Sequence, residues 1–359
     1  MTERLYVATR KGLLEYSMQN GAWVCGRQSF VGDPVTAVLR DGRDGSLYAA
    51  LNLGHFGVKM HRSEDGGATW RELPAPAFPA VPDGADGPSV SLIWTLVAGG
   101  ADRPGWLWAG TLPGGLFVSR DRGESWALNE PLWNHPRRGE WNGGGYDDPG
   151  IHSICVDPRD SSRLAIGVSS GGVWMTADAG QTWSLGGKGL RAAYMPPALA
   201  FEPIAQDPHR LARCPAAPDV IWCQHHNGIF RSEDGGESFT EIETASPSAF
   251  GFAVAVHPAD PDTAWFVPAV KDEFRYPVDQ RLVATVTRDG GRTFTTLDAG
   301  LPDQPSFDLI YRHALDVDGA GDRLAMGSTT GNLWVGEAGG TRWQQVSGYL
   351  PPIHQVLWA

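Results

Sequence analysis

One short motif recurs along the chain at nearly fixed spacing. It combines a Ser or Thr, an Asp, a Gly, a second Ser or Thr and a closing aromatic residue, as in Thr176-Ala-Asp-Ala-Gly-Gln-Thr-Trp183. Five well-formed copies and two degenerate ones lie near residues 17–23, 63–70, 119–126, 176–183, 232–239, 287–294 and 337–343. The closing aromatics are between 47 and 57 residues apart, so the sequence predicts seven copies of one supersecondary unit.

The fourth repeat shows the unit most clearly. Apolar runs at 151–156, 163–168, 173–176 and 182–185 predict four short antiparallel strands, with the motif as the turn between the third and the fourth. In such a turn the Asp accepts hydrogen bonds from nearby backbone amides, and the Gly supplies a positive φ. We therefore interpret the motif as a device that builds the fold, and we do not expect its Asp to be catalytic.

The two ends of the chain complement each other. The first repeat lacks its first strand, whereas the last repeat is followed by a surplus strand at 353–358. Pairing of the surplus strand with the N-terminal unit would close a ring and remove the exposed sheet edges. The sequence thus predicts an all-β, seven-bladed propeller of four-stranded blades, formed by residues 1–359 as a single domain.

The repeated pattern resembles the Asp-box, or bacterial neuraminidase repeat, whose form is Ser-x-Asp-x-Gly-x-Thr-Trp. The resemblance covers nearly the whole chain and implies a β-propeller. It leaves the activity open, because the repeat occurs in sialidases, other glycosidases, sorting receptors and assembly factors. Sialidases of this family have six blades, an Arg triad, a Tyr/Glu nucleophile pair and an Asp acid/base. In this chain seven blades are predicted, and no triad can be assigned residue by residue.

Composition narrows the classes of partner and compartment. The formal net charge of −12 argues against nucleic acid or an anionic membrane as a partner. The four Cys show no zinc-ligand spacing and are interpreted as reduced thiols, three of them in predicted strands. The first residues lack the apolar core of a signal peptide, and no run of about 18 apolar residues occurs. A cytoplasmic protein is therefore expected.

Alignment of the repeats places three histidines at one position. His152, His209 and His354 fall at the same end of the innermost strand of their blades, at the mouth of the central channel. The other four blades carry Trp94, Phe252, Arg312 and Val35 at this position. Such a ring could bind a divalent metal ion through His152, His209 and His354, or an anion with His as acid or base. Alternatively, each His only bonds the backbone of a neighbouring blade.

Long loops on the same face carry further candidate residues. The insertions span 75–89, 127–150, 186–207 and 271–281. Within the second, Glu140 and Asp147 offer a carboxylate pair and Tyr146 a ring for stacking on a sugar. The alternative is a polar lid without chemistry.

Two shorter clusters complete the candidate site. Residues 224–227 contain His225 and His226, of which one is expected to face the pocket if the strand persists, and Arg275 lies in a charged excursion. Surface histidines without function are the alternative for the first of these clusters.

Two function classes fit this pattern. The first is a hydrolase or lyase for a small polar or sugar-like anionic molecule, with His152, His209, Arg312, Glu140 and Asp147 as catalytic residues. Its substrate-binding residues are predicted to be His225, His226, Trp94, Tyr146, Arg275 and His354. The second is a non-catalytic ligand-binding or protein-assembly scaffold. A true exo-sialidase is a third interpretation, which the blade count disfavours.

Overall fold

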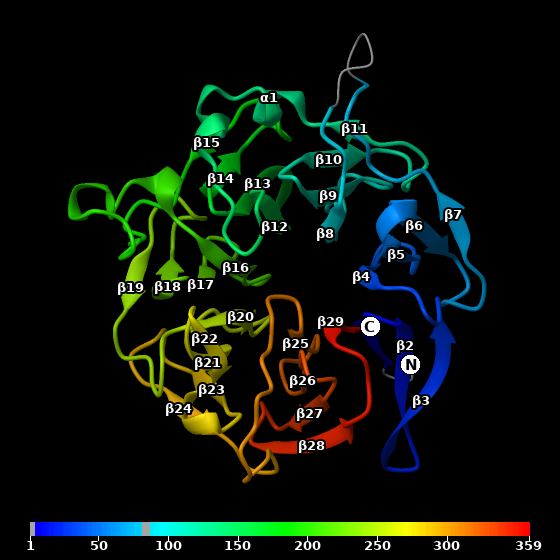
Figure 1. Cartoon of the computed structure of the whole chain (residues 1–359), viewed down its shortest axis with the longest axis vertical. Coiled ribbons are helices and arrows are strands. Elements are labelled where there is room, and N and C mark those ends of the chain that lie inside the picture. Colours follow the sequence, from blue (N-terminus) through cyan, green and yellow to red (C-terminus); the bar gives the residue numbers. More distant parts are fainter. Residues whose placement is uncertain (1–3, 81–86) are drawn as a thin grey trace.

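Seven antiparallel sheets surround a central axis in the computed structural model, which describes residues 4–80 and 87–359 (Figure 1). Each sheet runs radially, with the first strand of the unit next to the axis and the fourth at the rim. The prediction of an all-β, seven-bladed propeller is confirmed.

Each blade contains four strands that follow one another from the axis outwards. The first three blades consist of β29 (Ile353–Trp358), β1 (Arg4–Thr9), β2 (Gly12–Gln19) and β3 (Ala22–Ser29); β4 (Val35–Arg40), β5 (Leu47–Asn52), β6 (Val58–Ser63) and β7 (Arg71–Leu73); and β8 (Leu92–Ala98), β9 (Leu107–Leu112), β10 (Leu116–Ser119) and β11 (Ala127–Leu128). The fourth and fifth consist of β12 (Gly150–Asp157), β13 (Asp160–Ser169), β14 (Gly172–Thr176) and β15 (Ser184–Leu185); and β16 (Pro208–Arg213), β17 (Ile221–His225), β18 (Gly228–Ser232) and β19 (Thr240–Ile242). The last two consist of β20 (Gly251–Val256), β21 (Ala264–Lys271), β23 (Ala284–Thr287) and β24 (Thr295–Leu297); and β25 (Leu315–Val317), β26 (Leu324–Gly327), β27 (Leu333–Glu337) and β28 (Arg342–Ser347).

The C-terminal strand closes the ring as the sequence predicts. Strand β29 pairs antiparallel with β1, with Leu5 opposite Trp358. The Trp358 ring packs edge-on against Trp23 at a centroid distance of 5.4 Å. Closure therefore joins the two ends of the chain in one sheet, and the inner strands form an uninterrupted circle.

The repeated turn makes the same hydrogen bonds in each well-formed copy. In the fourth blade the Thr176 hydroxyl donates to Asp178 Oδ1 (2.7 Å) and accepts from the Gly180 amide (3.0 Å). The amide and hydroxyl of Thr182 both donate to the Asp178 carboxylate, at 2.9 and 2.6 Å. These bonds, first those from Thr182, lower the pKa of Asp178 to about 2. The carboxylate is occupied in holding the turn, as expected for a structural residue.

The apolar core lies between neighbouring blades. Trp108, Trp174, Trp222 and Trp265 are fully buried on the middle strands of their sheets. One cluster, for example, joins Val173 of the fourth blade to Ile221 and Phe230 of the fifth. Because every blade buries both faces against its neighbours, the inner strands hold the loop ends in fixed positions.

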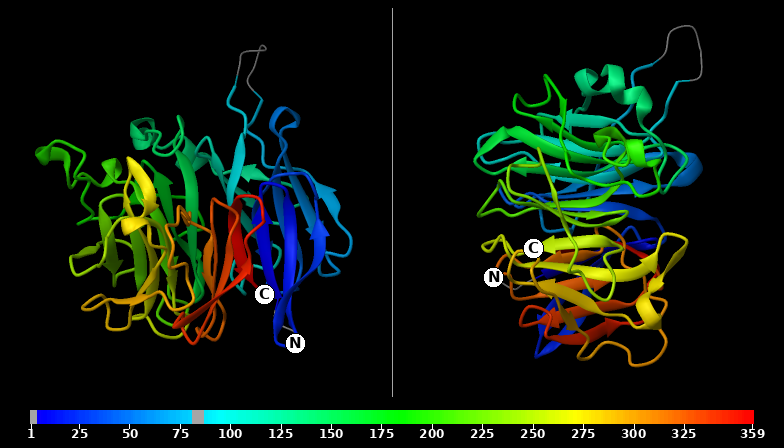
Figure 2. Two further views of the ribbon diagram at one scale, coloured as in Figure 1. Left: turned by 60° about the horizontal axis from the view of Figure 1, so that its bottom comes forward. Right: turned by 90° about the vertical axis from the view of Figure 1, so that its left-hand side faces the viewer.

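The longer connections lie together on one side of the ring, which we call the loop face (Figure 2). They contain the helical turns η1 (Gly54–Phe56), α1 (Glu130–Trp133), η3 (Pro136–Glu140), η4 (Pro197–Leu199), η5 (Pro203–Ala205) and η6 (Val278–Gln280). The excursion at 271–281 is more regular than expected, since β22 (Phe274–Pro277) pairs with β21. Part of the 75–89 insertion, residues 81–86, lies outside the described residues. Among the described helices, none has the length and apolarity needed to cross a membrane.

Candidate functional site

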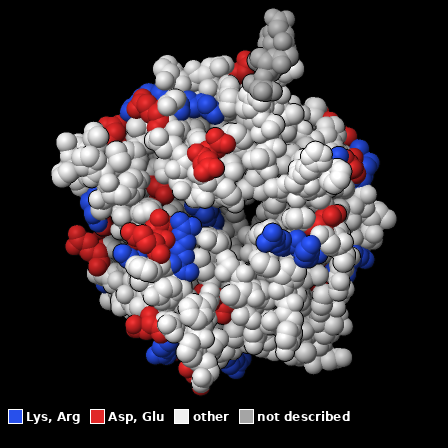
Figure 3. Space-filling model, viewed as in Figure 1, with Lys and Arg blue, Asp and Glu red and all other residues white. Residues whose placement is uncertain are grey.

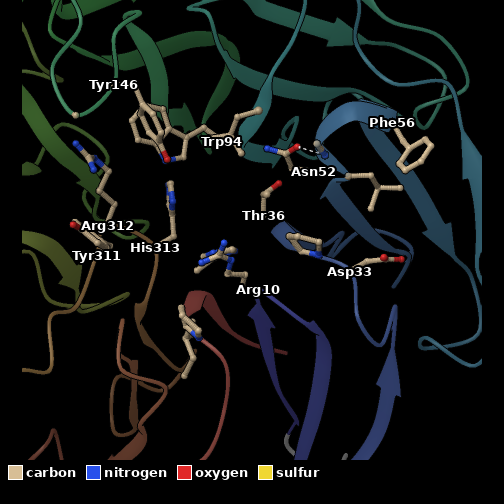
Figure 4. Close-up of a pocket in the computed structure, with 18 of the residues that line it drawn as sticks. Arg10, Asp33, Thr36, Asn52, Phe56, Trp94, Tyr146, Tyr311, Arg312 and His313 are labelled. Atoms are coloured by element: carbon tan, nitrogen blue, oxygen red, sulfur yellow. Dashed lines mark hydrogen bonds between the residues drawn. The ribbon is translucent and has the colours of Figure 1, made fainter.

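A cavity of about 890 Å³ opens on the loop face at the centre of the ring, where Lys and Arg side chains border a hollow (Figures 3 and 4). Residues from most of the blades line this larger cavity, because the inner strands of the blades end there. Its polar and aromatic lining residues are Arg10, Asp33, Thr36, Asn52, Phe56, Trp94, Tyr146, Arg275, Tyr311, Arg312, His313 and His354. Its size and mixed lining are those of a small-molecule site.

Arg312 is the most unusual group in this lining. The side chain is 7% exposed, and its guanidinium lies 4.9 Å from the Trp94 ring centroid and 5.6 Å from that of Phe252. Among the residues that the structure describes, none forms a salt bridge or hydrogen bond with this guanidinium, and its Nε is buried without a partner. Burial lowers the pKa of Arg312. The nearby carboxylate of Asp207 opposes this effect without a direct contact. Because the donors of the guanidinium stay unpaired, it is a candidate receptor for an anionic ligand.

A smaller cavity of about 140 Å³ adjoins the larger one, since Gly145, Arg275 and Arg312 line both. Asp207, His209 and His226 line the smaller cavity. Asp207 lies directly before β16, His209 on β16, and His226 in the turn after β17. The pairing of β16 with β17 thus brings the three side chains together.

The three groups are close but not hydrogen-bonded. Oδ2 of Asp207 lies 3.6 Å from Nε2 of His209 and 3.4 Å from Nδ1 of His226, beyond the usual range of an N–H···O bond. Burial raises the pKa of Asp207, but the neighbouring His209, His226 and Arg312 outweigh it and hold that pKa well below its usual value. Burial lowers the pKa of His209, against the opposing effect of Asp207. At neutral pH this describes an ionised carboxylate beside a neutral imidazole.

His225 supports this arrangement from behind. It is fully buried, and the Asp207 amide donates to its Nε2 at 3.1 Å. The amide of His226 in turn donates to the backbone oxygen of Asp207 (3.0 Å). Burial lowers the pKa of His225 to about 3. Of the two adjacent histidines, His226 lines the smaller cavity. His225, which was predicted to bind the substrate, lines neither cavity and holds the loop instead.

The structure separates the three histidines that the repeat alignment groups together. His152 is fully buried beneath the Trp94 ring, at a centroid distance of 5.4 Å, and its Nε2 has no partner among the described residues. His354 lines the larger cavity and donates from Nδ1 to the backbone oxygen of Val35 (2.9 Å). His209 lines the smaller cavity. The combination His152, His209 and His354 does not appear as a metal-binding group among the described residues, whereas Asp207, His209 and His226 does.

The carboxylates proposed from the sequence lie elsewhere. Glu140 is bound to Arg137 by two hydrogen bonds of 2.8 Å, which lower the pKa of its carboxyl. Asp147 is exposed, and neither residue is among those that line the two cavities. The carboxylate beside the predicted histidine is Asp207 instead. Asp207 was not among the site residues predicted from the sequence, and its spacing of two residues from His209 was the available signal.

The predicted ligand-binding residues Trp94 and Tyr146 do line the larger cavity (Figure 4). Arg275 lines it as well. Trp94 and Tyr146 meet edge to face at 5.2 Å. Arg275 is held by Asp272 through a 2.5 Å bond to its guanidinium. His313, which the repeat alignment did not single out, also lines the cavity, and its Nε2 donates to the backbone oxygen of His152 (2.8 Å).

Comparison with known proteins supports the propeller fold but does not assign the chain to a family. No protein-family model matches the chain, so membership of the Asp-box family stays a prediction. The sequence is 23% identical to a xyloglucanase of Hypocrea jecorina over 269 residues, which are 70% of this chain. The match spans only 27% of that relative, about a quarter of its length.

Solved structures show the same architecture. A GH74 enzyme of Niastella koreensis superimposes with a TM-score of 0.61 and 14% identity, over 96% of this chain and 54% of the enzyme. A structure of YCF48 bound to D1 peptide superimposes with a TM-score of 0.54 and 16% identity, over 94% of this chain and 88% of the other. At such low identity these similarities establish the fold alone.

Proposed function

We propose that the protein is a glycosidase-like hydrolase or a lyase that acts on a small sugar-like molecule carrying a carboxylate. The observation that carries the proposal is Arg312, a buried guanidinium that lines both cavities and has no direct salt bridge or hydrogen bond among the described residues. A bidentate carboxylate would neutralise it and satisfy its donors. The similarity to a protein named a xyloglucanase supports a sugar as the rest of the ligand.

The larger cavity suits a molecule of this size and polarity. Trp94, Tyr146 and Tyr311 supply aromatic surface for stacking on a sugar ring, and Asn52 and Thr36 supply hydrogen-bonding groups for hydroxyls. A volume of about 890 Å³ lies within the range of small-molecule sites. The ligand would therefore enter as a small molecule through the hollow of the loop face.

The reacting groups that we assign are Asp207, His209 and His226. They line the cavity that adjoins the larger one at Arg312, so a carboxylate on Arg312 would hold the neighbouring bond of the ligand beside them. Such groups transfer protons or activate water when they are held close together and partly shielded from solvent. Glu140 and Asp147, which line neither cavity, have no part in this assignment.

Binding of glucuronic acid, with glucose as the neutral match, tests the proposal by isothermal titration calorimetry. We expect the uronic acid to bind and the variant Arg312→Met to weaken it about 10- to 100-fold, since a charged hydrogen-bonded contact is lost. Aryl glucuronides and a uronate-containing oligosaccharide then report hydrolysis or elimination.

A matched control is Arg138→Met. Arg138 is a partly buried guanidinium stacked on an aromatic ring, 3.4 Å from the Trp133 centroid, but it lines neither cavity. This variant should leave uronate binding unchanged. Equal binding of glucuronic acid to the wild type and to Arg312→Met would refute the proposed role of Arg312. Preference for N-acetylneuraminic acid would favour the exo-sialidase interpretation instead.

A peptide-binding scaffold is the second candidate. Several aromatic side chains in the inserted segments are exposed, including Phe201 (59%), Phe274 (51%) and Phe307 (58%). A similar structure holds a peptide. Exposed apolar groups of this kind suit a protein partner. This candidate predicts that Phe201→Ser and Phe274→Ser abolish capture of a partner peptide and leave uronate binding intact.

A further inference from the structure

We propose that Asp207, His209 and His226 hold a divalent transition-metal ion, with zinc the best match, on the wall of the smaller cavity. A catalytic role of this ion rests on the function proposed above, but its binding does not. Binding of the ion follows from the geometry of the three side chains and is testable without a substrate.

The first argument is the spacing of the candidate ligand atoms. Zinc binds imidazole nitrogen and carboxylate oxygen at about 2.0–2.2 Å, and a tetrahedral arrangement places such atoms about 3.3–3.5 Å apart. Oδ2 of Asp207 lies 3.4 Å from Nδ1 of His226 and 3.6 Å from Nε2 of His209, and all three atoms fall within 4.8 Å of one another. A direct hydrogen bond would bring each pair closer, to about 2.7–3.2 Å.

The second argument is the hydrogen bond on the far side of the His209 ring. Its Nδ1 lies 2.7 Å from the backbone oxygen of Gly251, so this nitrogen carries the proton and donates. In the neutral ring Nε2 then presents a lone pair towards the carboxylate of Asp207. Two lone pairs that face each other repel, and a cation between them removes the repulsion. A carbonyl that fixes the tautomer of a ligating histidine is the usual outer contact of a metal site.

Asp207 provides the third argument. It is 5% exposed, and its Oδ1 is buried without a hydrogen-bond partner among the described residues. Its backbone is fixed by the buried ring of His225, which accepts the Asp207 amide. A carboxylate with an unsatisfied buried oxygen is expensive unless a cation compensates it. The carboxylate is thus anchored in place and still lacks a partner on one oxygen.

The fourth argument is the free space beside the cluster. Three protein ligands leave at least one position of a zinc ion open, as in catalytic rather than structural sites. The three side chains line the smaller cavity, whose volume of about 140 Å³ leaves space for a water molecule of about 30 Å³. Arg312 and Tyr194 line the same cavity, so a bound water would face the predicted anion site.

Calorimetric titration of the full chain with zinc chloride tests the proposal, after treatment with EDTA and removal of any affinity tag. We expect one ion per chain, and zinc should raise the melting temperature of the wild type. Asp207→Asn and His226→Gln should each weaken binding at least about 100-fold, more than the loss of an outer contact causes. His354→Gln, which alters a cavity histidine outside the cluster, should bind zinc as the wild type does.

Circular dichroism of the metal-free variants checks their folding; His226 is only partly buried, so His226→Gln should fold even if Asp207→Asn does not. Absence of saturable zinc binding, or equal affinity in the wild type and His226→Gln, would overturn the proposal. Loss of zinc binding in His354→Gln would place the ion in the channel and would also overturn the proposal.

The two proposals can fail separately. If zinc fails to bind while Arg312 still controls uronate binding, only the metal site is refuted. If zinc binds without any uronate binding, the proposed function fails instead.

Discussion

The backbone amide of Trp358 donates to Oδ2 of Asp316 at 2.9 Å, and this hydrogen bond links the last strand of the ring to the preceding blade. Trp358 belongs to β29 and Asp316 to β25, so the bond ties the closing strand to the blade before it, whereas β1 pairs with β29 within its own blade. A second bond nearby, from the amide of Val356 to the backbone oxygen of His313, is 3.1 Å long. Closure therefore depends on contacts to both neighbours of β29.

Removal of residues 353–359 is expected to destabilise the whole ring. The deletion exposes the edge of β1 and uncovers Trp23, so the effect should exceed that of Trp358→Ala, for which we expect a loss of about 3–5 kcal/mol. Thermal unfolding followed by circular dichroism measures both. Tyr349→Ala is the control, because that side chain is 99% exposed. A truncated protein with an unchanged melting temperature would contradict the closure argument.

Asp316 should make stability depend on pH. Burial raises the pKa of its carboxyl to about 6, with a smaller opposing effect of Arg210 and a reinforcing one of Asp318. The stabilisation from the protonated form is complete below the unfolded value near 4 and is lost as the pH rises through about 6. A tenfold difference in proton affinity between the folded and unfolded states corresponds to about 1.4 kcal/mol. Because the side chain is partly exposed, we expect the free energy of unfolding to fall by roughly 1–2 kcal/mol over this pH range.

Asp316→Asn keeps an acceptor for the Trp358 amide and removes the titration. We expect the stability of the wild type to fall relative to this variant between pH 4 and pH 7. Urea unfolding of the two proteins at both pH values measures the difference, and effects of other groups cancel in the comparison. Parallel pH profiles would show that Asp316 ionises normally.

The repeated turn should contribute to stability and not to binding. Thr176→Val removes the hydroxyl that accepts from Gly180 and donates to Asp178, and we expect a loss of about 1–3 kcal/mol because a buried amide is left unpaired. Uronate and zinc binding should be unaffected, since the turn lies away from the loop face. Ser184→Ala, at an exposed position on β15, is the control. Weaker ligand binding in Thr176→Val would indicate a role beyond the fold.

Glu140→Gln and Asp147→Asn are expected to keep uronate binding and any activity within about twofold of the wild type. Glu140 is paired with Arg137 and Asp147 is exposed, and neither lines a cavity. Activity on an aryl glucuronide, or uronate affinity in its absence, measures the effect. A loss of tenfold or more in either variant would return these carboxylates to the catalytic assignment.

Sequence patterns predicted the architecture of the ring, but only part of the candidate site. The spacing of the aromatic residues and the surplus strand at 353–358 predicted the blade number and the closure, both of which are confirmed. The same alignment treated His152 and His209 as equivalent, yet one is covered by Trp94 and the other faces a cavity. Equivalent backbone positions differ in access because the covering side chains come from neighbouring blades and loops.

The sequence by itself determined the repeating unit, because Asp178 and Thr182 act on atoms within a few residues of themselves and such local bonds recur wherever the motif recurs. Only the tertiary structure decided which ionisable groups meet. Asp207 and His226 are separated by a strand, a loop and a second strand, and the pairing of β16 with β17 brings them within 3.4 Å. The alignment of the repeats placed Arg312 at the channel mouth, but only the packing of Trp94 and Phe252 around it shows a buried guanidinium without a direct salt bridge among the described residues. Proximity and desolvation are properties of the packed ring, and no short stretch of sequence encodes them.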